Sequence, residues 1–340
     1  MKALLIGGTG VISTSVVERL LRLNWDVTIL TRGKSAMPAF MQGKVKQITT
    51  DIHDEAAVQH ALKGLYFDAV CDFVLYTPQE AERDIRLFSG KTGQYVFISS
   101  ASAYHKPVLS LPITEETPLH NPYWAYSDLK AQCEKAFLQA HREGKLPVTI
   151  VRPSHTYCER SLPVQIHGGR GPWVVMKRML EGKSVPVACD GVSLWTATTA
   201  EDFAVYFCGL LGNEKALGEA FHITSDESLT WNQIYQIIAD GVGGEFKPCY
   251  VSAHTLAAST QYDYRGSLLG DKAHTVIFDN SKVKCVTGIC DHKCTPFSEG
   301  AKRSVQYFLE HPEIRREDPA FELFCDQLEV MMQKANNSMK

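Results

Sequence analysis

The fold is decided by KALLIGGTGVIS, the stretch at residues 2–13. Its apolar run Ala3–Ile6 predicts a buried β-strand, and the apolar repeat of Val16–Leu21 predicts an amphipathic helix. A glycine-rich turn between a strand and a helix lets a pyrophosphate approach the backbone and the positive end of the helix dipole. This context predicts a dinucleotide-binding turn, with contacts from Gly7, Gly8, Thr9, Gly10, Val11 and Ile12.

Further strands and helices alternate outward from this turn. Amphipathic stretches separate candidate strands at Lys2–Ile6, Asp26–Thr31, Val45–Thr49, Ala69–Phe73, Gln94–Ser99 and Val148–Arg152. Such alternation is typical of repeated βαβ units, because parallel strands need crossover connections. We therefore expect an α/β fold, a Rossmann-type doubly wound parallel sheet, over residues 1–160.

The pattern loosens in the second half of the chain. It predicts a loop at Ser161–Pro172, a strand at Ser184–Ala188, and helices at Val174–Glu181, Thr230–Gly241 and Ser298–Leu309. We interpret residues 161–330 as a smaller C-terminal α/β substrate-binding domain, with some later strands returning to the main sheet.

The composition is that of an ordinary soluble protein. The 340 residues are 44% hydrophobic and 21% charged, and the formal net charge of -3 argues against nucleic acid or an anionic membrane as the main partner. We expect a cytoplasmic enzyme whose ten cysteines are reduced thiols. Cys290 and Cys294 have a zinc-like spacing, with Cys285 and His292 nearby, but no second pair accompanies them. Free thiols and no metal are the favoured interpretation.

The end of the second strand bears on the type of cofactor. A carboxylate there would accept hydrogen bonds from the ribose 2′-hydroxyl of NAD, but the chain has Thr31 and Arg32 instead. Arg32 can pair with a 2′-phosphate, so the sequence favours NADP(H) and leaves NAD(H) open. Asp51 and Ile52 are expected near the adenine, and Asp54 is the better candidate for a helix cap.

A tyrosine and a lysine four residues apart mark a candidate catalytic helix. Tyr126 and Lys130 share one face of that helix, and a neighbouring ammonium lowers the pKa of a phenol. Tyr126 is therefore a candidate acid/base. Upstream, Ser99 and Ser100 stand at the carboxyl end of a predicted strand, where ligands bind in open α/β sheets and a hydroxyl can orient the reacting oxygen.

In these motifs the chain resembles the extended short-chain dehydrogenases/reductases of the NAD-dependent epimerase/dehydratase family. Ser99–Tyr104, Tyr126–Lys130, Arg152–Tyr157 and Phe278–Lys282 resemble the family's serine strand, catalytic helix, nicotinamide-flanking segment and late signature. The resemblance implies that Ser100 is the catalytic hydroxyl and that Lys130 binds the nicotinamide ribose. It also implies a homodimer, and cofactor contacts from Phe73, Ser99, Tyr126, Lys130 and Pro153.

The chain departs from the family pattern around the substrate. Ala101 and Ser102 stand where the family's dehydratases carry acidic residues, and Trp195 stands where many members have a diphosphate-binding arginine. Either the substrate lacks a diphosphate, or another cation holds it, such as Arg170, Lys177 or Arg178. Bulky residues at 73–76 crowd the cofactor, and a histidine replaces the usual asparagine at 155. The expected substrate contacts are Tyr76, Ser102, His155 and Trp195.

These features predict an NAD(P)-dependent epimerase or reductase acting on a sugar, a nucleotide sugar or a similar polar hydroxyl or ketone compound. The alternative is a non-catalytic dinucleotide sensor or RNA-binding protein on the same scaffold. The intact Ser100, Tyr126 and Lys130 argue against that alternative, as does the slightly acidic net charge.

Overall fold

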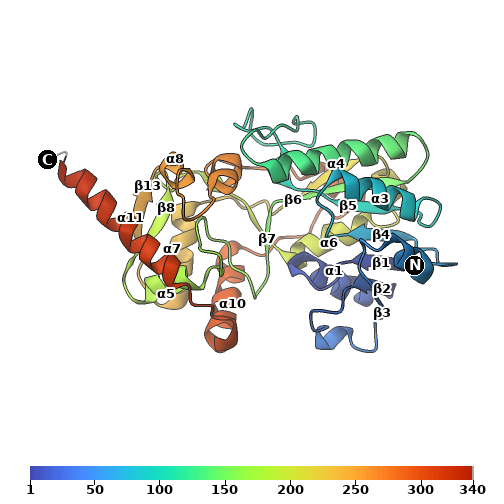
Figure 1. Cartoon of the computed structure of the whole chain (residues 1–340), viewed down its shortest axis with the longest axis horizontal. Coiled ribbons are helices and arrows are strands. Elements are labelled where there is room, and N and C mark those ends of the chain that lie inside the picture. The colour runs from blue at the N-terminus through green and yellow to red at the C-terminus, as the bar shows by residue number, and fades with distance from the viewer. Residues whose placement is uncertain (339–340) are drawn as a thin grey trace.

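The computed structural model describes residues 1–338, and its N-terminal half is built around one parallel sheet (Figure 1). The seven strands run in the order β11-β6-β5-β4-β1-β2-β3. They are β1 (Lys2–Ile6), β2 (Asp26–Thr31), β3 (Lys46–Thr49), β4 (Ala69–Asp72), β5 (Tyr95–Ile98), β6 (Val148–Pro153) and β11 (Ala220–Ile223). This order confirms the Rossmann-type doubly wound sheet. The predicted strands differ from the observed ones by no more than one residue at an end.

Helices cover both faces of this sheet. The helices on one face are α1 (Val11–Arg22), α6 (Ala200–Leu210) and α9 (Ser281–Thr287), which share a core with Val27, Ile29 and Phe221. The helices on the other face are α2 (Glu55–Ala61), α3 (Pro78–Phe88) and α4 (Ala125–Arg142). Strand β11 and helices α6 and α9 come from the second half of the sequence, so the chain returns to the sheet after leaving it.

The C-terminal half has its own core and is also α/β. Strands β8 (Ser184–Ala188) and β13 (Lys247–Val251) pair in parallel. Around them lie α5 (Trp173–Leu180), α7 (Trp231–Val242), α8 (Ala253–Ala257), α10 (Phe297–Glu310) and α11 (Pro319–Ser338). Short strands lie between the halves, with β7 (His155–Tyr157) paired to β10 (Ala197–Thr199) and β9 (Leu194–Trp195) paired to β12 (Leu229–Thr230). The sequence pattern did not predict these four short strands.

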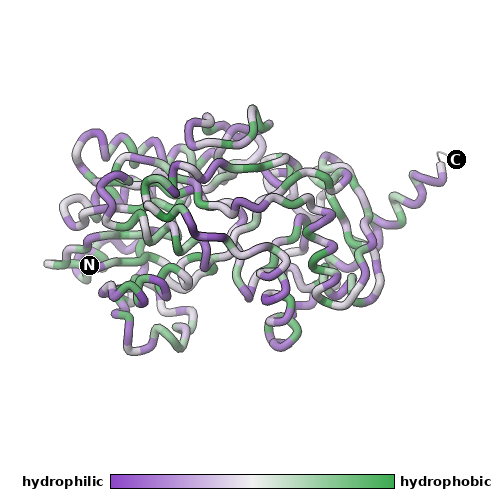
Figure 2. The backbone as a smooth tube through the Cα atoms, turned by 180° about the vertical axis from the view of Figure 1, so that it is seen from behind, coloured by the Kyte–Doolittle hydropathy of each residue, from purple (hydrophilic) through white to green (hydrophobic). Residues whose placement is uncertain are grey.

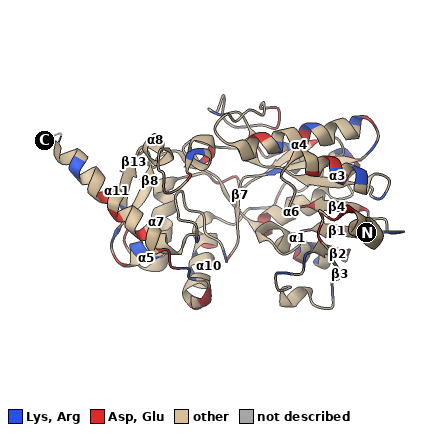
Figure 3. Ribbon diagram, in the orientation of Figure 1, with Lys and Arg blue, Asp and Glu red and all other residues tan. Residues whose placement is uncertain are grey.

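The surface carries mixed charge, and the apolar residues gather inside. Figure 2 shows hydrophobic segments running through the centre of the N-terminal half, where the strands lie. Figure 3 shows lysines and arginines interspersed with aspartates and glutamates over both halves, without a face of one sign in that view. Within residues 1–338, none of the helices has the length and apolar character needed to span a bilayer.

Candidate active site

The glycine turn approaches its neighbouring strands too closely for side chains. Gly7 has φ +84°, and a Cβ there would lie 2.5 Å from Cγ1 of Val74. A Cβ on Gly8 would lie 2.6 Å from Cγ2 of Ile29. Ser13 fixes the turn, because its Oγ donates to the carbonyl of Gly7 (2.7 Å) and accepts from the backbone N–H of Gly10 (2.8 Å). Only glycine satisfies this geometry at positions 7 and 8.

A cleft of about 510 Å³ opens above this turn, at the carboxyl ends of the central strands. It begins at the turn itself and continues past the ends of β2, β3 and β4, where open α/β sheets bind their ligands. Of the predicted cofactor contacts, those that line it are Gly7, Thr9, Gly10, Thr31, Arg32, Asp51 and Ile52. Its size and its position at a helix N-terminus fit a dinucleotide.

The remaining residues of the turn face elsewhere. Gly8 lies against Ile29, Val11 is 36% exposed, and Ile12 packs against the core under α1. Their side chains do not line the cleft in the described part of the chain, so any contact from these three residues comes from the backbone.

The far end of the cleft carries positive charge. Arg32 and Lys34 are exposed and line it, and no carboxylate follows β2 directly. Oδ1 of Asp51 accepts from the backbone N–H of His53 (3.1 Å), which holds this aspartate in its turn. Asp54 caps α2 by accepting from the N–H of Ala57, as the sequence predicted.

A second cavity, of about 300 Å³, lies at the start of α4. The residues that line it come from the tip of β5, from α4, from the segment after β6 and from a distant π-helix at Arg265–Lys272. They are Ser100, Ala101, Ser102, Trp124, Tyr126, Pro153, Ser154, His155, Trp195, Asp271 and Lys272. The structure thus brings Tyr126 and Ser100 together with three of the four predicted substrate contacts.

Hydroxyl groups form a chain along the wall of this second cavity. Oγ of Ser100 lies 2.8 Å from Oγ of Ser102, which lies 2.7 Å from Oγ of Ser127. The ring of Tyr126 lies 5.0 Å from the ring of Trp124, measured between centroids. Trp124 is held by the π-helix, where a Cβ on Gly266 would lie 2.2 Å from the indole ring. A segment 140 residues downstream therefore closes the site around Tyr126.

The predicted effect of Lys130 on Tyr126 is wrong for this structure. Burial raises the pKa of Tyr126 to about 12, and a hydrogen bond with Ser100 acts only partly against that increase. Nζ of Lys130 donates instead to the backbone carbonyls of Leu75 (2.6 Å) and Ile98 (2.8 Å). Burial also lowers the pKa of Lys130 to about 8. The ammonium is therefore engaged by two strand ends, and desolvation dominates the titration of the phenol.

Tyr76 stands between the two cavities. It lines the dinucleotide cleft, its ring centroid lies 6.3 Å from that of Tyr126, and Nζ of Lys130 lies 4.7 Å from its ring. Tyr76 is 47% exposed, so its ring can move without disturbing the core. The carboxylate of Glu80 fixes only its backbone, by accepting from the N–H groups of Tyr76 and Thr77. The expected crowding at 73–76 is therefore present.

Two predicted cofactor contacts lie away from the cleft. The ring of Phe73 lies 5.9 Å from that of Phe207 on α6, and Val74 takes its place in the cleft lining. Ser99 is buried, and its hydroxyl donates to Glu134, which is ion-paired with Arg152 (2.6 Å). Alternate residues of a strand point to opposite faces, which explains why the neighbours Val74 and Ser100 reach the cavities instead.

A buried network supports the floor of the site behind Ser99. Arg152 donates to the hydroxyl of Tyr104 (3.1 Å), which lies 3.0 Å from Nδ1 of His222. Nε2 of His222 lies 2.7 Å from the carbonyl of Asp279, so this nitrogen carries the proton. The network joins β5, β6 and β11 to the segment that precedes α9.

This network predicts a loss of stability on acidification. Burial lowers the pKa of His222 from 6.5 to about 4, so between these pH values the unfolded chain binds a proton that the folded chain does not. The free energy of unfolding therefore falls as the pH falls through this window, by about 3 kcal/mol from His222. His222→Gln should flatten the pH dependence between pH 7 and pH 4 by this amount, measured by urea unfolding. An unchanged dependence would contradict this assignment.

His155 and Trp195 form the apolar wall of the second cavity. Burial lowers the pKa of His155 to about 3, so it is neutral at physiological pH. Trp195 is 2% exposed and stacks on Trp231, with ring centroids 5.2 Å apart. Among the described residues, nothing accepts a hydrogen bond from its indole Nε1. The cavity therefore keeps one donor free beside largely apolar walls.

The cations proposed as substitutes for a diphosphate-binding arginine serve another purpose. Lys177 pairs with Glu317 and Glu322, and Arg178 pairs with Asp326 on α11. Arg170 donates to the backbone carbonyl of Glu317 (2.9 Å). All three hold the C-terminal helix and its approach, and none lines the second cavity. The interpretation that one of them binds a diphosphate is wrong.

Sequence reasoning missed Asp271 and Lys272, which line the second cavity from the π-helix. Burial raises the pKa of Asp271 to about 6, and it lowers that of Lys272 to about 8. The Nζ of Lys272 donates to the backbone carbonyl of Val164 (2.9 Å). No local pattern marks this segment in the sequence, because its place in the site depends on a long-range fold.

Comparison with known proteins identifies the family. The model of the "NAD dependent epimerase/dehydratase family" matches residues 3–224, which hold the glycine turn, Ser100, Tyr126 and Lys130. The chain belongs to this family. As a member of it, the chain is an NAD-dependent enzyme of the epimerase or reductase kind.

Two curated relatives of this family member are similar at 26% identity. One is 2'-dehydrokanamycin reductase of Streptomyces kanamyceticus, over 76% of this chain and 71% of that protein. The other is chloroplast stem-loop binding protein of 41 kDa b of Arabidopsis thaliana, over 71% of this chain and 63% of that protein. Among solved structures, epimerase Mth375 of Methanothermobacter thermautotrophicus superposes with a TM-score of 0.74 at 17% identity, covering 92% and 94% of the two chains. That likeness shows the shared fold.

Proposed function

We propose that this family member reduces a ketone of a compact polar substrate, of the size of one sugar ring, with Tyr126 as the proton donor. The observation that carries the proposal is that Tyr126 and Ser100 share one cavity of about 300 Å³ next to the dinucleotide cleft. A bound nicotinamide dinucleotide supplies the hydride in this chemistry. The chain supplies the proton, the orientation of the substrate oxygen and the exclusion of water.

The direction of the reaction follows from the protonation of Tyr126. With its pKa raised to about 12, the side chain is a phenol at neutral pH and has a proton to give. The hydroxyl of Ser100 lies in the same cavity and can donate to the same substrate oxygen, while Ser102 accepts or donates behind it. A protonated acid beside a carbonyl oxygen favours reduction, in which the developing alkoxide takes the proton.

The cavity lining favours a substrate without a diphosphate. Its charged groups are Asp271 and Lys272, and no arginine lines it in the described part of the chain. A diphosphate calls for bidentate cationic partners, which this cavity does not offer. The carboxylate of Asp271 and the free Nε1 of Trp195 suit hydroxyl or amino groups of a sugar ring. The similarity to 2'-dehydrokanamycin reductase supports a ketone on an amino sugar.

The proposal is tested by the oxidation of NADPH with keto sugars at neutral pH. We expect turnover with free or glycosidic keto sugars to exceed turnover with the matching nucleotide-linked sugars. A chain that turns over only the nucleotide-linked substrates would contradict the proposed substrate class. The homodimer implied by the family resemblance stays a prediction, for which light scattering is the measurement.

Arg32 is proposed to select NADP(H) over NAD(H). It lines the cleft just after β2, is exposed and makes no ion pair with the described residues, so its guanidinium is free to meet a 2′-phosphate. In Arg32→Ser we expect the affinity for NADPH to fall about 10- to 100-fold, as a charge-assisted bidentate contact is lost.

The affinity of the same variant for NADH is the internal control and should change little. Both affinities are measured by energy transfer from tryptophan to the reduced nicotinamide. An equal loss for NADH and NADPH would mean that Arg32 contacts a part common to both dinucleotides, and it would remove the proposed preference.

A second candidate function is RNA binding, and the observation that favours it is the similarity to the chloroplast stem-loop binding protein. Retention of a stem-loop RNA that weakens steeply with added salt is the expected sign of such a function. The mixed surface charge in Figure 3 and the net charge of -3 offer little for a phosphate backbone. The reductase therefore stays the leading proposal.

A further inference from the structure

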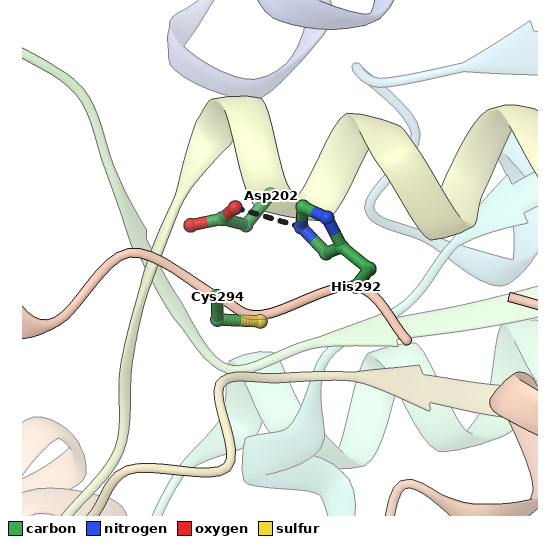
Figure 4. Close-up of side chains that lie close together, drawn as sticks. All are labelled: Asp202, His292 and Cys294. Atoms are coloured by element: carbon green, nitrogen blue, oxygen red, sulfur yellow. Dashed lines mark hydrogen bonds and ion pairs between the residues drawn. The ribbon is translucent and has the colours of Figure 1, made fainter. Parts of the chain in front are cut away.

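A second cluster of reactive side chains lies outside both cavities of the active site. Figure 4 shows Asp202, from the first turn of α6, beside His292 and Cys294, from the connection between α9 and α10. A carboxylate oxygen, a ring nitrogen and the sulfur of these residues all lie within 4.8 Å of one another. None of the three lines the dinucleotide cleft or the cavity beside Tyr126.

The carboxylate of Asp202 is held in a fixed orientation. Its Oδ2 accepts from Oγ1 of Thr199 (2.6 Å) and from the backbone N–H of Thr295 (2.8 Å). Its Oδ1 lies 2.9 Å from Nε2 of His292. Outer partners that orient a carboxylate in this way are a regular feature of metal sites, because they fix the first ligand before the ion arrives.

The connecting segment places its ligands on one side. Cys290, His292 and Cys294 alternate along residues 288–296, and alternate residues of an extended segment point the same way. These three residues line one open cavity of about 600 Å³, together with Asp226 and Lys284. Cys290 is exposed and lies two residues from His292, so it can supply a fourth ligand.

We propose that Asp202, His292 and Cys294 bind a zinc ion, with Cys290 completing the site. A set of one carboxylate oxygen, one imidazole nitrogen and thiolate sulfur suits zinc, whereas magnesium and calcium prefer oxygen alone. Binding releases the thiol protons of Cys294 and Cys290 to the solvent and leaves the imidazole neutral. The sequence pattern missed the site because Asp202 lies 90 residues from His292 and the local spacing offered no second pair.

The position of the ion gives it a structural effect. Helix α9 packs on α6 in the N-terminal half, and α10 packs on α7 in the C-terminal half. The segment 288–296 is the connection between them, and zinc would fasten it to the start of α6. The ion is therefore expected to stabilise the joint between the two halves, without taking part in the reaction at Tyr126.

The test is the zinc content of the full-length chain after loading with zinc and gel filtration. We expect about one ion per chain, and a fall to roughly a tenth of that in His292→Ala and in Cys294→Ser. Cys285→Ser is the matched control: it removes an exposed cysteine of α9 outside the cluster and should keep the ion. Removing zinc with a chelator should lower the Tm of the native chain by roughly 5–10 °C.

Cobalt substitution of the native chain provides a measurement that does not depend on the folding of variants. A thiolate-to-cobalt band in the near ultraviolet, which added zinc abolishes, is the expected result. Two outcomes would overturn the proposal. One is a native chain that retains less than roughly a tenth of an ion, which would mean that Asp202 and His292 form only an ion pair. The other is a cobalt spectrum without sulfur ligation.

Discussion

Tyr126→Phe should lower the turnover number by about 1,000-fold or more, and the affinity for the dinucleotide should stay within about twofold of its native value. The substitution removes only the phenolic oxygen. The ring stays in place beside Trp124 and Tyr76, so the shape of the cavity is kept. The loss should appear in kcat, because the proton moves in the transition state and contributes little to binding.

Tyr123→Phe is the matched control for this substitution. Tyr123 lies three residues earlier in the chain and does not line either cavity in the described structure. Its variant should turn over at the native rate. Near-native turnover in Tyr126→Phe would show that another group supplies the proton. A loss confined to KM would show that Tyr126 serves in binding alone.

Gly7→Ala should lower the affinity for the dinucleotide about 100-fold. The new methyl group would meet Cγ1 of Val74 at 2.5 Å, and alanine is strained at φ +84°. The backbone must shift to relieve both, which moves the turn away from the pyrophosphate. The affinity is measured by titration with the reduced cofactor, and the native fold is checked by circular dichroism.

Gly64→Ala separates backbone strain from the geometry of the cleft. Gly64 has φ +74° with nothing within 4 Å of its hypothetical Cβ, and it lies outside the cleft. It should lose stability without losing cofactor affinity. Adding Val74→Ala to Gly7→Ala removes the clash and should restore part of the affinity. Native affinity in Gly7→Ala would mean that the turn does not hold the pyrophosphate.

Local patterns were enough to predict the sheet and the glycine turn. Strands β1 and β2 were predicted to the residue, because a buried parallel strand is a continuous apolar run bounded by turn residues. The turn at Gly7 was identified because its function requires a residue type that few other constraints select. Asp54 was predicted as a helix cap for the same reason, since its bond to Ala57 spans only three residues.

The environment of each side chain was harder to predict. Whether Ser99 or Ser100 faces the cavity depends on the phase of β5, and Glu134, the partner of Ser99, lies 35 residues away. The pKa of Tyr126 depends on burial under a π-helix 140 residues downstream, which no spacing near Tyr126 reveals. Arg178 looked like a phosphate ligand, yet α11 binds it through Asp326. Long-range packing decides all three.

The most direct test of the account is a crystal structure of the chain with bound NADPH. The account predicts the pyrophosphate over the turn at Gly7, and C4 of the nicotinamide within roughly 5 Å of the Tyr126 oxygen. That distance leaves room for one substrate carbon and its oxygen. A nicotinamide ring that lies outside the cavity of Ser100 and Tyr126, with Tyr76 closing the passage between the two cavities, would contradict the central claim.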